Sequence, residues 1–288
     1  MTGADWELDF YSRPILESDG RKRWELLITT TPSTDGRADP FRFARCCPSS
    51  DVNSIWLAAA LREAMDTAED GGWGRPRRLR CWRSSMRTMV QRAASELELE
   101  MISSRRTYAL LDWLMQREQE VYPKEEGFMA GPLAPPPAAI PTPPIPLPEA
   151  VQGDAWTWAA LPLGLLREAN GWPMDFSALI PLPESINDDA LVPGLRLFSK
   201  TRALALSGWL GGLEPVRLMI EGRQLVLEAG QDDRWLVSDL ETAVAEEIDQ
   251  ALAGTRDGAK GLQFIAVQTG PEEQSFAGFW MMRDIPMP

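Results

Sequence analysis

The sequence contains no histidine, and this absence excludes more functions than any other feature of the chain. Imidazole is the usual proton shuttle near neutral pH and the commonest metal ligand in proteins. A serine or cysteine nucleophile would lack its customary base here, so an active site would depend on carboxylates alone. The three cysteines, Cys46, Cys47 and Cys81, have neither the spacing of a disulfide framework nor that of a zinc site. We expect them to be small buried residues.

Long apolar runs and glycine-rich nucleotide loops are missing as well. No stretch is long enough to span a bilayer, and Met1–Asp9 carries acids where a signal peptide has basic residues. We therefore expect a cytoplasmic protein without an integral membrane segment. Gly208, Gly211 and Gly212 match neither the Walker pattern nor the dinucleotide-binding pattern. We expect no small-molecule cofactor.

An arginine-rich segment interrupts this acidic chain of net charge -13. Residues 75–92 contain no acid and seven arginines, namely Arg75, Arg77, Arg78, Arg80, Arg83, Arg87 and Arg92. Salt screens the repulsion between the whole chain and a polyanion beyond about 8 Å, so a local cluster can still contact phosphate. The segment predicts a nucleic-acid partner.

A proline-rich segment divides the chain. Residues 131–148 contain nine prolines in eighteen positions, which excludes helix and sheet and favours an extended chain. We predict an N-terminal domain over 1–130, a linker over 131–150 and a C-terminal domain over 151–288. Residues 1–130 have 19 bases and 21 acids, a net charge of -2, whereas residues 131–288 have 10 bases and 21 acids, a net charge of -11.

Both halves have the patterns of mixed-sheet α/β domains. The predicted N-terminal strands are Trp6–Leu16, Lys22–Thr31, Pro40–Cys47, Leu79–Trp82 and Leu97–Ser103, with helices after Asp51, after Arg83 and over Tyr108–Val121. This order is that of the ribonuclease H-like fold. The predicted C-terminal strands are Ala155–Leu161, Phe176–Leu182, Pro215–Glu221, Arg223–Glu228, Arg234–Val237, Leu262–Gln268 and Phe276–Arg283, with helices over Lys200–Trp209 and Leu240–Ala253.

The ribonuclease H analogy allows a test for metal-dependent hydrolysis. Nucleases of that fold place metal-binding carboxylates on the first strand, on the first helix and at the end of the fourth strand. Asp9 and Glu63 fit the first two places, but the fourth strand ends in Cys81-Trp82-Arg83. Because the two-metal site is incomplete, we expect no metal site and no enzyme. These carboxylates, with Glu7 and Glu25, are then solvated charges or partners of buried arginines.

The candidate nucleic-acid-binding residues are the arginines and the tryptophans among them: Arg75, Arg77, Arg78, Arg83, Arg87, Arg105, Arg106, Trp73 and Trp82. Each has a structural alternative. Arg105 and Arg106 either widen the basic patch or anchor the helix that follows them. Arg80 lies in an inner strand, where we expect a carboxylate such as Glu25 or Glu98 to pair with it.

Four segments together resemble a known family. They are Trp6–Pro14, Trp24–Leu27, the run from Ser104-Arg105-Arg106-Thr107-Tyr108 to Gln116–Pro123, and the pair Gly261–Phe264 with Phe276–Trp280. The chain is similar to the Tab-two/Atab-two family of cyanobacterial and chloroplast RNA-binding proteins, which promote translation of photosystem reaction-centre messages. The family's near-terminal Trp-Leu-Leu tripeptide stands here as Trp280-Met281-Met282, and methionine is close to leucine in volume.

The resemblance implies binding of single-stranded A/U-rich leader RNA, chiefly for a photosystem I subunit, without cofactor or catalysis. It also implies cyanobacterial-type localisation in the cytoplasm, with peripheral association with thylakoid membranes and contact with ribosomes or photosystem assembly factors. About five phosphate contacts give an expected salt slope near -3.5. Two other functions stay open: a protein-binding adaptor in photosystem assembly that uses the acidic second half, and a metal-dependent nuclease on the same fold.

Overall fold

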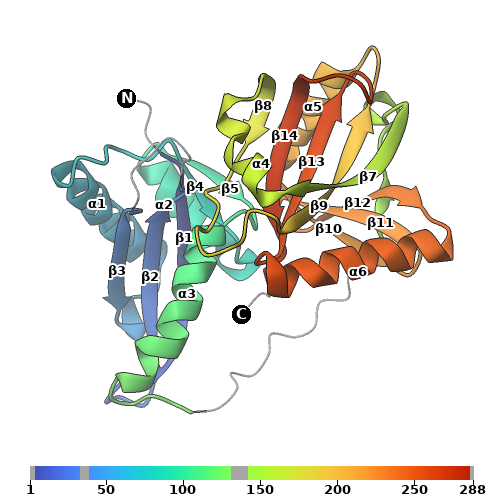
Figure 1. Cartoon of the computed structure of the whole chain (residues 1–288). Coiled ribbons are helices and arrows are strands. Elements are labelled where there is room, and N and C mark those ends of the chain that lie inside the picture. Colours follow the sequence, from blue (N-terminus) through green and yellow to red (C-terminus); the bar gives the residue numbers. More distant parts are fainter. Residues whose placement is uncertain (1–3, 33–38, 131–141, 286–288) are drawn as a thin grey trace. The chain divides into compact units, whose positions relative to one another are not determined.

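The computed structural model describes residues 4–32, 39–130 and 142–285, which form two compact units (Figure 1). Unit 1 comprises the described residues before 131, and unit 2 the described residues from Thr142 onward. Each unit has two apolar cores of its own. The predicted mixed α/β class is confirmed.

Unit 1 contains one mixed sheet of five strands in the order β3-β2-β1-β4-β5. Its elements in chain order are β1 (Trp6–Leu16), β2 (Lys22–Thr30), β3 (Arg42–Cys47), α1 (Ser54–Asp70), β4 (Arg78–Cys81), α2 (Arg87–Glu96), β5 (Glu100–Ser103) and α3 (Tyr108–Glu120). β1 is antiparallel to β2 and parallel to β4, so it lies in the middle of the sheet. The chain order agrees with the predicted order, while the likeness to ribonuclease H stays a prediction.

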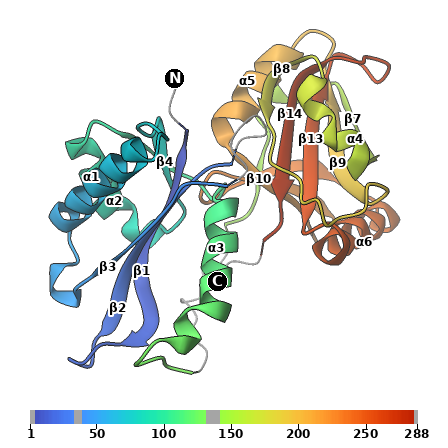
Figure 2. The ribbon, with the colours of Figure 1, turned by 60° about the vertical axis from the view of Figure 1, so that its left-hand side comes forward.

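The central strand β1 has an alternating pattern because its two faces meet different helices. Trp6, Leu8 and Phe10 lie in the core that α1 and α2 cover, and α3 covers the opposite face (Figure 2). Glu7 and Asp9 lie on that opposite face and are buried although both side chains are acidic. The sheet therefore carries carboxylates at its centre, and each of them needs a partner there.

Two local signals fix the ends of these elements. The side chain of Asn53 caps α1, because its Oδ1 accepts hydrogen bonds from the backbone N–H groups of Ile55 and Trp56 at 3.0 and 2.9 Å. Gly20 has a φ of 77° in the turn that joins β1 to β2, a conformation that glycine adopts without steric cost. The helix begins close to the position expected from the sequence, after Asp51.

Unit 2 has two mixed sheets, ordered β10-β11-β12-β6 and β7-β9-β13-β14-β8. Its elements are β6 (Ile145–Pro146), β7 (Ala155–Pro162), α4 (Leu163–Arg167), β8 (Met174–Ala178), β9 (Leu191–Phe198), α5 (Ala203–Leu213), β10 (Pro215–Glu221), β11 (Gln224–Ala229), β12 (Asp233–Asp239), α6 (Thr242–Gly258), β13 (Leu262–Gln268) and β14 (Phe276–Arg283). Residues from both sheets, α5 and α6 share one core, while α4 lies on the other core.

Strand β9 is absent from the predicted elements, although it lies inside its sheet between β7 and β13. It contains Pro193-Gly194, a pair that argues against an inner strand. The glycine is needed, because a Cβ atom at position 194 would lie 2.4 Å from the backbone oxygen of Phe264. The strand predicted over Phe176–Leu182 is displaced, since β8 ends at Ala178.

The proline-rich segment contributes to unit 2 at its C-terminal end. Residues 131–141 lie outside the described residues, but Ile145–Pro146 pairs with Trp235 and Leu236 of β12. The prediction that prolines exclude sheet throughout this segment is therefore wrong at β6. β6 lies at the edge of its sheet, where a proline's missing N–H group leaves no neighbouring strand unsatisfied.

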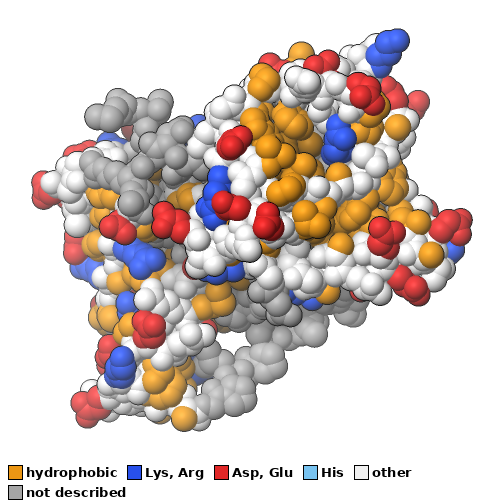
Figure 3. Space-filling view, in the orientation of Figure 1, with side chains coloured by type: hydrophobic (Ala, Val, Ile, Leu, Met, Phe, Trp, Pro, Cys, Tyr) orange, Lys and Arg blue, Asp and Glu red, His pale blue; other side chains and the backbone are white. Residues whose placement is uncertain are grey.

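The face of unit 2 that Figure 3 shows carries scattered acidic side chains around an apolar area. Within 4–32, 39–130 and 142–285, no helix combines the length and the apolar content that crossing a membrane requires.

The Trp280-Met281-Met282 tripeptide lies in β14, where all three side chains are buried. Its position indicates a packing role for these side chains.

Candidate nucleic-acid interface

Three arginines at the start of β4 converge on the carboxylate of Asp5. The Nε atoms of Arg77 and Arg78 and the Nη1 atom of Arg80 each lie 2.8 Å from an oxygen of Asp5. The contact follows from the sheet, because β1 and β4 run parallel with Trp6 beside Leu79. Burial opposes the charged form of Asp5, but the hydrogen bonds and charges of the arginines outweigh it and lower the pKa of this carboxyl. Arg80 is paired as predicted, but with a carboxylate that we did not expect.

Arg83 is held between two aromatic rings above Asp9. Its Nε lies 2.5 Å from Oδ1 of Asp9, and its Cζ lies 3.9 Å from the ring centre of Trp82 and 4.1 Å from that of Tyr11. The Arg83 side chain is 16% exposed. A guanidinium that covers a tryptophan face leaves that face closed to a base. Arg83 and Trp82 therefore contact each other, and their contact with RNA stays a prediction.

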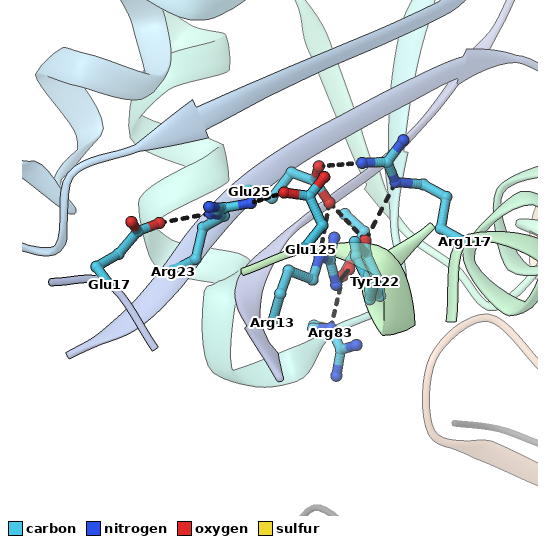
Figure 4. A network of polar contacts seen from close by, with 9 residues as sticks. Arg13, Glu17, Arg23, Glu25, Arg83, Arg117, Tyr122 and Glu125 are labelled. Atoms are coloured by element: carbon cyan, nitrogen blue, oxygen red, sulfur yellow. Dashed lines mark hydrogen bonds and ion pairs between the residues drawn. The ribbon is translucent and has the colours of Figure 1, made fainter. Parts of the chain in front are cut away.

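A network of polar side chains continues from Asp9 across the face of the sheet that α3 covers (Figure 4). Arg13 connects Asp9 and Glu25, with Nη1 at 2.8 Å from the first carboxylate and Nε at 3.1 Å from the second. Arg117 of α3 and the hydroxyl of Tyr122 each lie 2.5 Å from an oxygen of Glu25. Burial raises the pKa of Tyr122 above its usual value of 10, so the hydroxyl stays a donor to Glu25. These side chains fix α3 to the sheet.

Glu7 is the other carboxylate on this face, and it is completely buried. It accepts a hydrogen bond of 2.8 Å from the backbone N–H of Leu110, near the start of α3. Loss of solvation raises the pKa of Glu7 to about 7, although this hydrogen bond and the charge of Arg80 oppose the shift. Folding therefore favours the protonated form of this carboxyl.

Three arginines of the basic segment are exposed and make no ion pair with any residue that the structure describes. They are Arg75, which precedes β4, and Arg87 and Arg92 on the outer face of α2. Thr88, Gln91 and Ser95 are exposed on the same helix and add neutral hydrogen-bonding groups. The nearest acid on α2 is Glu96, whose carboxylate lies 3.4 Å from Arg62 of α1. The outer face of α2 is thus basic and polar.

The remaining predicted residues are divided between core and surface. Trp73 packs on the core beside Phe41, with ring centres 6.4 Å apart. Arg106 is buried and lies 5.5 Å from the ring centre of Tyr108, which favours its role as an anchor for α3. Arg105 and Arg106 both lie just before the start of α3. Arg106 is buried there, whereas Arg105 is half-buried.

Metal-dependent hydrolysis gains no support from the carboxylates. Asp9 bonds two arginines on the α3 face of the sheet, whereas Glu63 is exposed on α1 and bonds Arg45. Among the residues with described positions, no group of three or more Asp, Glu, His or Cys side chains is placed to hold a metal ion. Asp9 and Glu63 therefore do not form the pair that the nuclease hypothesis requires.

Sequence reasoning did not identify Asp5, Arg117 and Tyr122 as partners in these polar clusters. Asp5 lies at the edge of the strand pattern, and only the parallel pairing of β1 with β4 brings it to the arginines. Arg117 lies in the predicted helix Tyr108–Val121 and Tyr122 directly follows it, but a separation of five positions does not by itself predict that the two side chains meet. Both point to Glu25 of β2, which the sequence marks as a charged residue in an inner strand.

Comparisons with known proteins agree with the predicted resemblance. Residues 5–117 match the family model described as RNA-binding protein Tab2/Atab2 N terminal, and residues 134–283 match its C-terminal domain. Protein TAB2 homolog, chloroplastic, of Zea mays is 34% identical over 99% of this chain and 72% of its own length. The protein of the same name from Arabidopsis thaliana is 30% identical over 99% of this chain and 75% of its own length. No solved structure matches the chain. The chain belongs to the Tab2/Atab2 family of RNA-binding proteins.

Proposed function

We propose that the chain binds single-stranded, A/U-rich leader RNA and promotes translation of photosystem reaction-centre subunits. The observation that carries the proposal is the basic outer face of α2, which lies in the part of the chain that matches an RNA-binding family. Arg87 and Arg92 are exposed on this face without an ion-pair partner among the described residues. In a chain of net charge -13, such a face is the place where a polyanion meets the least repulsion.

The proposed contact surface consists of exposed arginines around β4 and α2. Arg75, Arg87 and Arg92 lie on it, together with Arg77 and Arg78, which remain partly exposed beside Asp5. Guanidinium groups bind phosphate oxygens with two parallel donors, and such contacts position the backbone without reading sequence. A/U-rich leaders suit this mode because weak pairing keeps them single-stranded and accessible.

The proposed site of action is the cytoplasm beside thylakoid membranes, where ribosomes translate photosystem messages. No cofactor is part of the proposal. The relatives bear the description chloroplastic, which is compatible with a role in the synthesis of photosynthetic proteins.

A gel shift with a photosystem leader RNA tests the proposal. We expect the Arg87→Gln/Arg92→Gln variant to bind at least about tenfold more weakly than the native chain, because two phosphate contacts are lost. The Arg21→Gln/Lys22→Gln variant removes the same charge from the exposed β1–β2 turn and should bind almost normally. In a translation extract, the native chain should raise the yield of a reporter that carries this leader. Equal weakening by both variants would mean that net charge, and not α2, determines binding.

A further inference from the structure

We propose that Asp5 is a positioning residue that holds Arg77 and Arg78 as a preformed clamp for an RNA phosphate. The inference rests on the proposed function, because it assigns one phosphate contact of the same surface. It reverses the usual interpretation of an ion pair, in which an arginine bonded to a carboxylate is no longer available to a ligand.

The first observation is how exposure differs between the carboxylate and the arginines that bond it. The Asp5 side chain is only 8% exposed, whereas that of Arg77 is 56% exposed. Arg77 uses Nε and Nη2 for the two oxygens of Asp5, at 2.8 and 3.1 Å. Its Nη1 has no bonding partner among the residues with described positions, so this corner of the guanidinium is available to a ligand.

The second observation is the local charge. Asp5 contributes one negative charge to a cluster in which Arg77, Arg78 and Arg80 contribute three positive ones. Two neighbouring acids reduce the surplus: Glu100 lies opposite Arg78 in the register of β5 with β4, and Glu7 lies near Arg80 on the buried face. Counting Glu100 leaves a surplus of one positive charge, and only ionised Glu7, on the buried face, would offset it. The cluster thus retains an attraction for an anion.

The third observation is that the backbone beneath the cluster is fixed. The N–H of Arg77 donates to the carbonyl oxygen of Ala4 at 3.0 Å, and the N–H of Thr31 donates to that of Asp5 at 2.7 Å. A free arginine loses roughly 2 kcal/mol of side-chain entropy when it is immobilised. Arginines that Asp5 already holds lose less of it on binding, and preorganisation of this kind strengthens binding.

The Asp5→Asn variant distinguishes this inference from a count of charges. The substitution removes one negative charge, so simple electrostatics predicts tighter RNA binding. Loss of the clamp predicts the opposite result. We expect Asp5→Asn to bind a fluorescein-labelled oligouridine of about 20 nucleotides about fivefold more weakly than the native chain, as measured by fluorescence anisotropy. The matched control Asp66→Asn, an exposed acid on α1, should bind as tightly as the native chain or tighter.

A double-mutant cycle separates positioning from a general loss of structure. In an Arg77→Gln/Arg78→Gln background, Asp5→Asn should have no further effect on affinity, since the arginines that it positions are gone. An effect that persists in this background overturns the inference. Arg77→Lys is a second test for the case in which Asp5→Asn does not fold. It keeps the positive charge but removes the planar guanidinium with its paired donors, so we expect it to bind RNA several-fold more weakly. Binding equal to that of the native chain overturns the inference.

The outcomes distinguish failure of the clamp from failure of the proposed function. If the native chain binds the RNA and Asp5→Asn binds equally or more tightly, the clamp is refuted while RNA binding stands. If the native chain binds neither oligouridine nor a photosystem leader, the proposed function is refuted, and the clamp with it.

Discussion

The Nε atom of Arg83 lies 2.5 Å from Oδ1 of Asp9, so a residue predicted to contact RNA neutralises a residue considered for a metal site. This one contact changes both hypotheses. Neither oxygen of Asp9 is left to bind a metal ion, because Nη1 of Arg13 bonds the other oxygen at 2.8 Å. The guanidinium of Arg83 in turn contacts the rings of Tyr11 and Trp82 and the buried carboxylate of Asp9. We therefore base the proposed RNA-binding surface on the more exposed arginines.

Replacing Arg83 should destabilise unit 1 more than it affects RNA contacts directly. In Arg83→Ala, Asp9 keeps Arg13 but loses one of its two cations inside the protein, and we expect a loss of about 3 kcal/mol in the free energy of unfolding. Urea denaturation measures this value. The control Arg87→Ala removes an exposed arginine and should change the unfolding free energy by less than about 0.5 kcal/mol. Equal stability of the two variants would contradict the buried role of Arg83.

Incubation with magnesium should leave RNA intact. The reason is that Asp9 bonds two arginines and Glu63 bonds Arg45, so neither carboxylate is available to bind a metal. We expect labelled leader RNA to remain full-length after prolonged incubation with the protein and Mg²⁺, as seen on a denaturing gel. Magnesium-dependent cleavage that disappears in Asp9→Asn would instead establish the nuclease.

Glu7 should make the stability of unit 1 depend on pH. Burial raises the pKa of Glu7 from 4.5 to about 7, so the folded state favours the protonated form. The resulting stabilisation is fully present below pH 4.5 and is lost as the pH rises through about 7. Across this window it amounts to about 3 kcal/mol.

The Glu7→Gln variant isolates this contribution, because an amide oxygen can still accept the hydrogen bond from the N–H of Leu110. The difference in unfolding free energy between native chain and variant should move in favour of the variant as the pH rises from 4.5 to 8. Urea titrations at a series of pH values measure the difference. A constant difference would show that Glu7 titrates normally.

Restoring the family tripeptide in β14 should be nearly neutral. Met281 and Met282 are buried in the two cores of unit 2, and leucine has almost the same volume as methionine. We expect Met281→Leu/Met282→Leu to change the unfolding free energy by less than about 1.5 kcal/mol and to leave RNA affinity unchanged. Trp280→Ala is the contrasting variant, because loss of a buried indole should cost about 4 kcal/mol. A gain in RNA affinity from the leucines would assign this segment a binding role.

The N-terminal elements were predictable because local chemistry determines them. β1 alternates between apolar and charged residues over Trp6–Phe10, and the helix expected after Asp51 begins at Ser54. β9 was not predictable by the same rules. Its Pro193-Gly194 pair breaks a strand pattern, and the glycine is explained only by the approach of Phe264 from β13. That approach is a tertiary contact between residues far apart in the chain.

The candidate site was predictable as a segment but not as a surface. The sequence identifies the arginines of residues 75–92, but their exposure depends on which carboxylates the fold places beside them. Asp5 and Asp9 come from β1 or the residue before it, and they reach the arginines because β1 and β4 are neighbours. A charge count along the chain therefore cannot separate Arg83, which is held by Asp9, from Arg87, which is exposed.

The salt dependence of RNA binding should report how many arginines contact phosphate. Each phosphate contact contributes about -0.7 to the slope of log affinity against log salt for a single strand, so five contacts give a slope near -3.5. Arg87→Gln/Arg92→Gln should make the slope shallower by about 1.4, whereas Arg21→Gln/Lys22→Gln should leave it unchanged. Anisotropy titrations between 50 and about 300 mM KCl measure these slopes. A native slope near zero would contradict phosphate binding by α2, because contacts that release no counterions are not contacts with the RNA backbone.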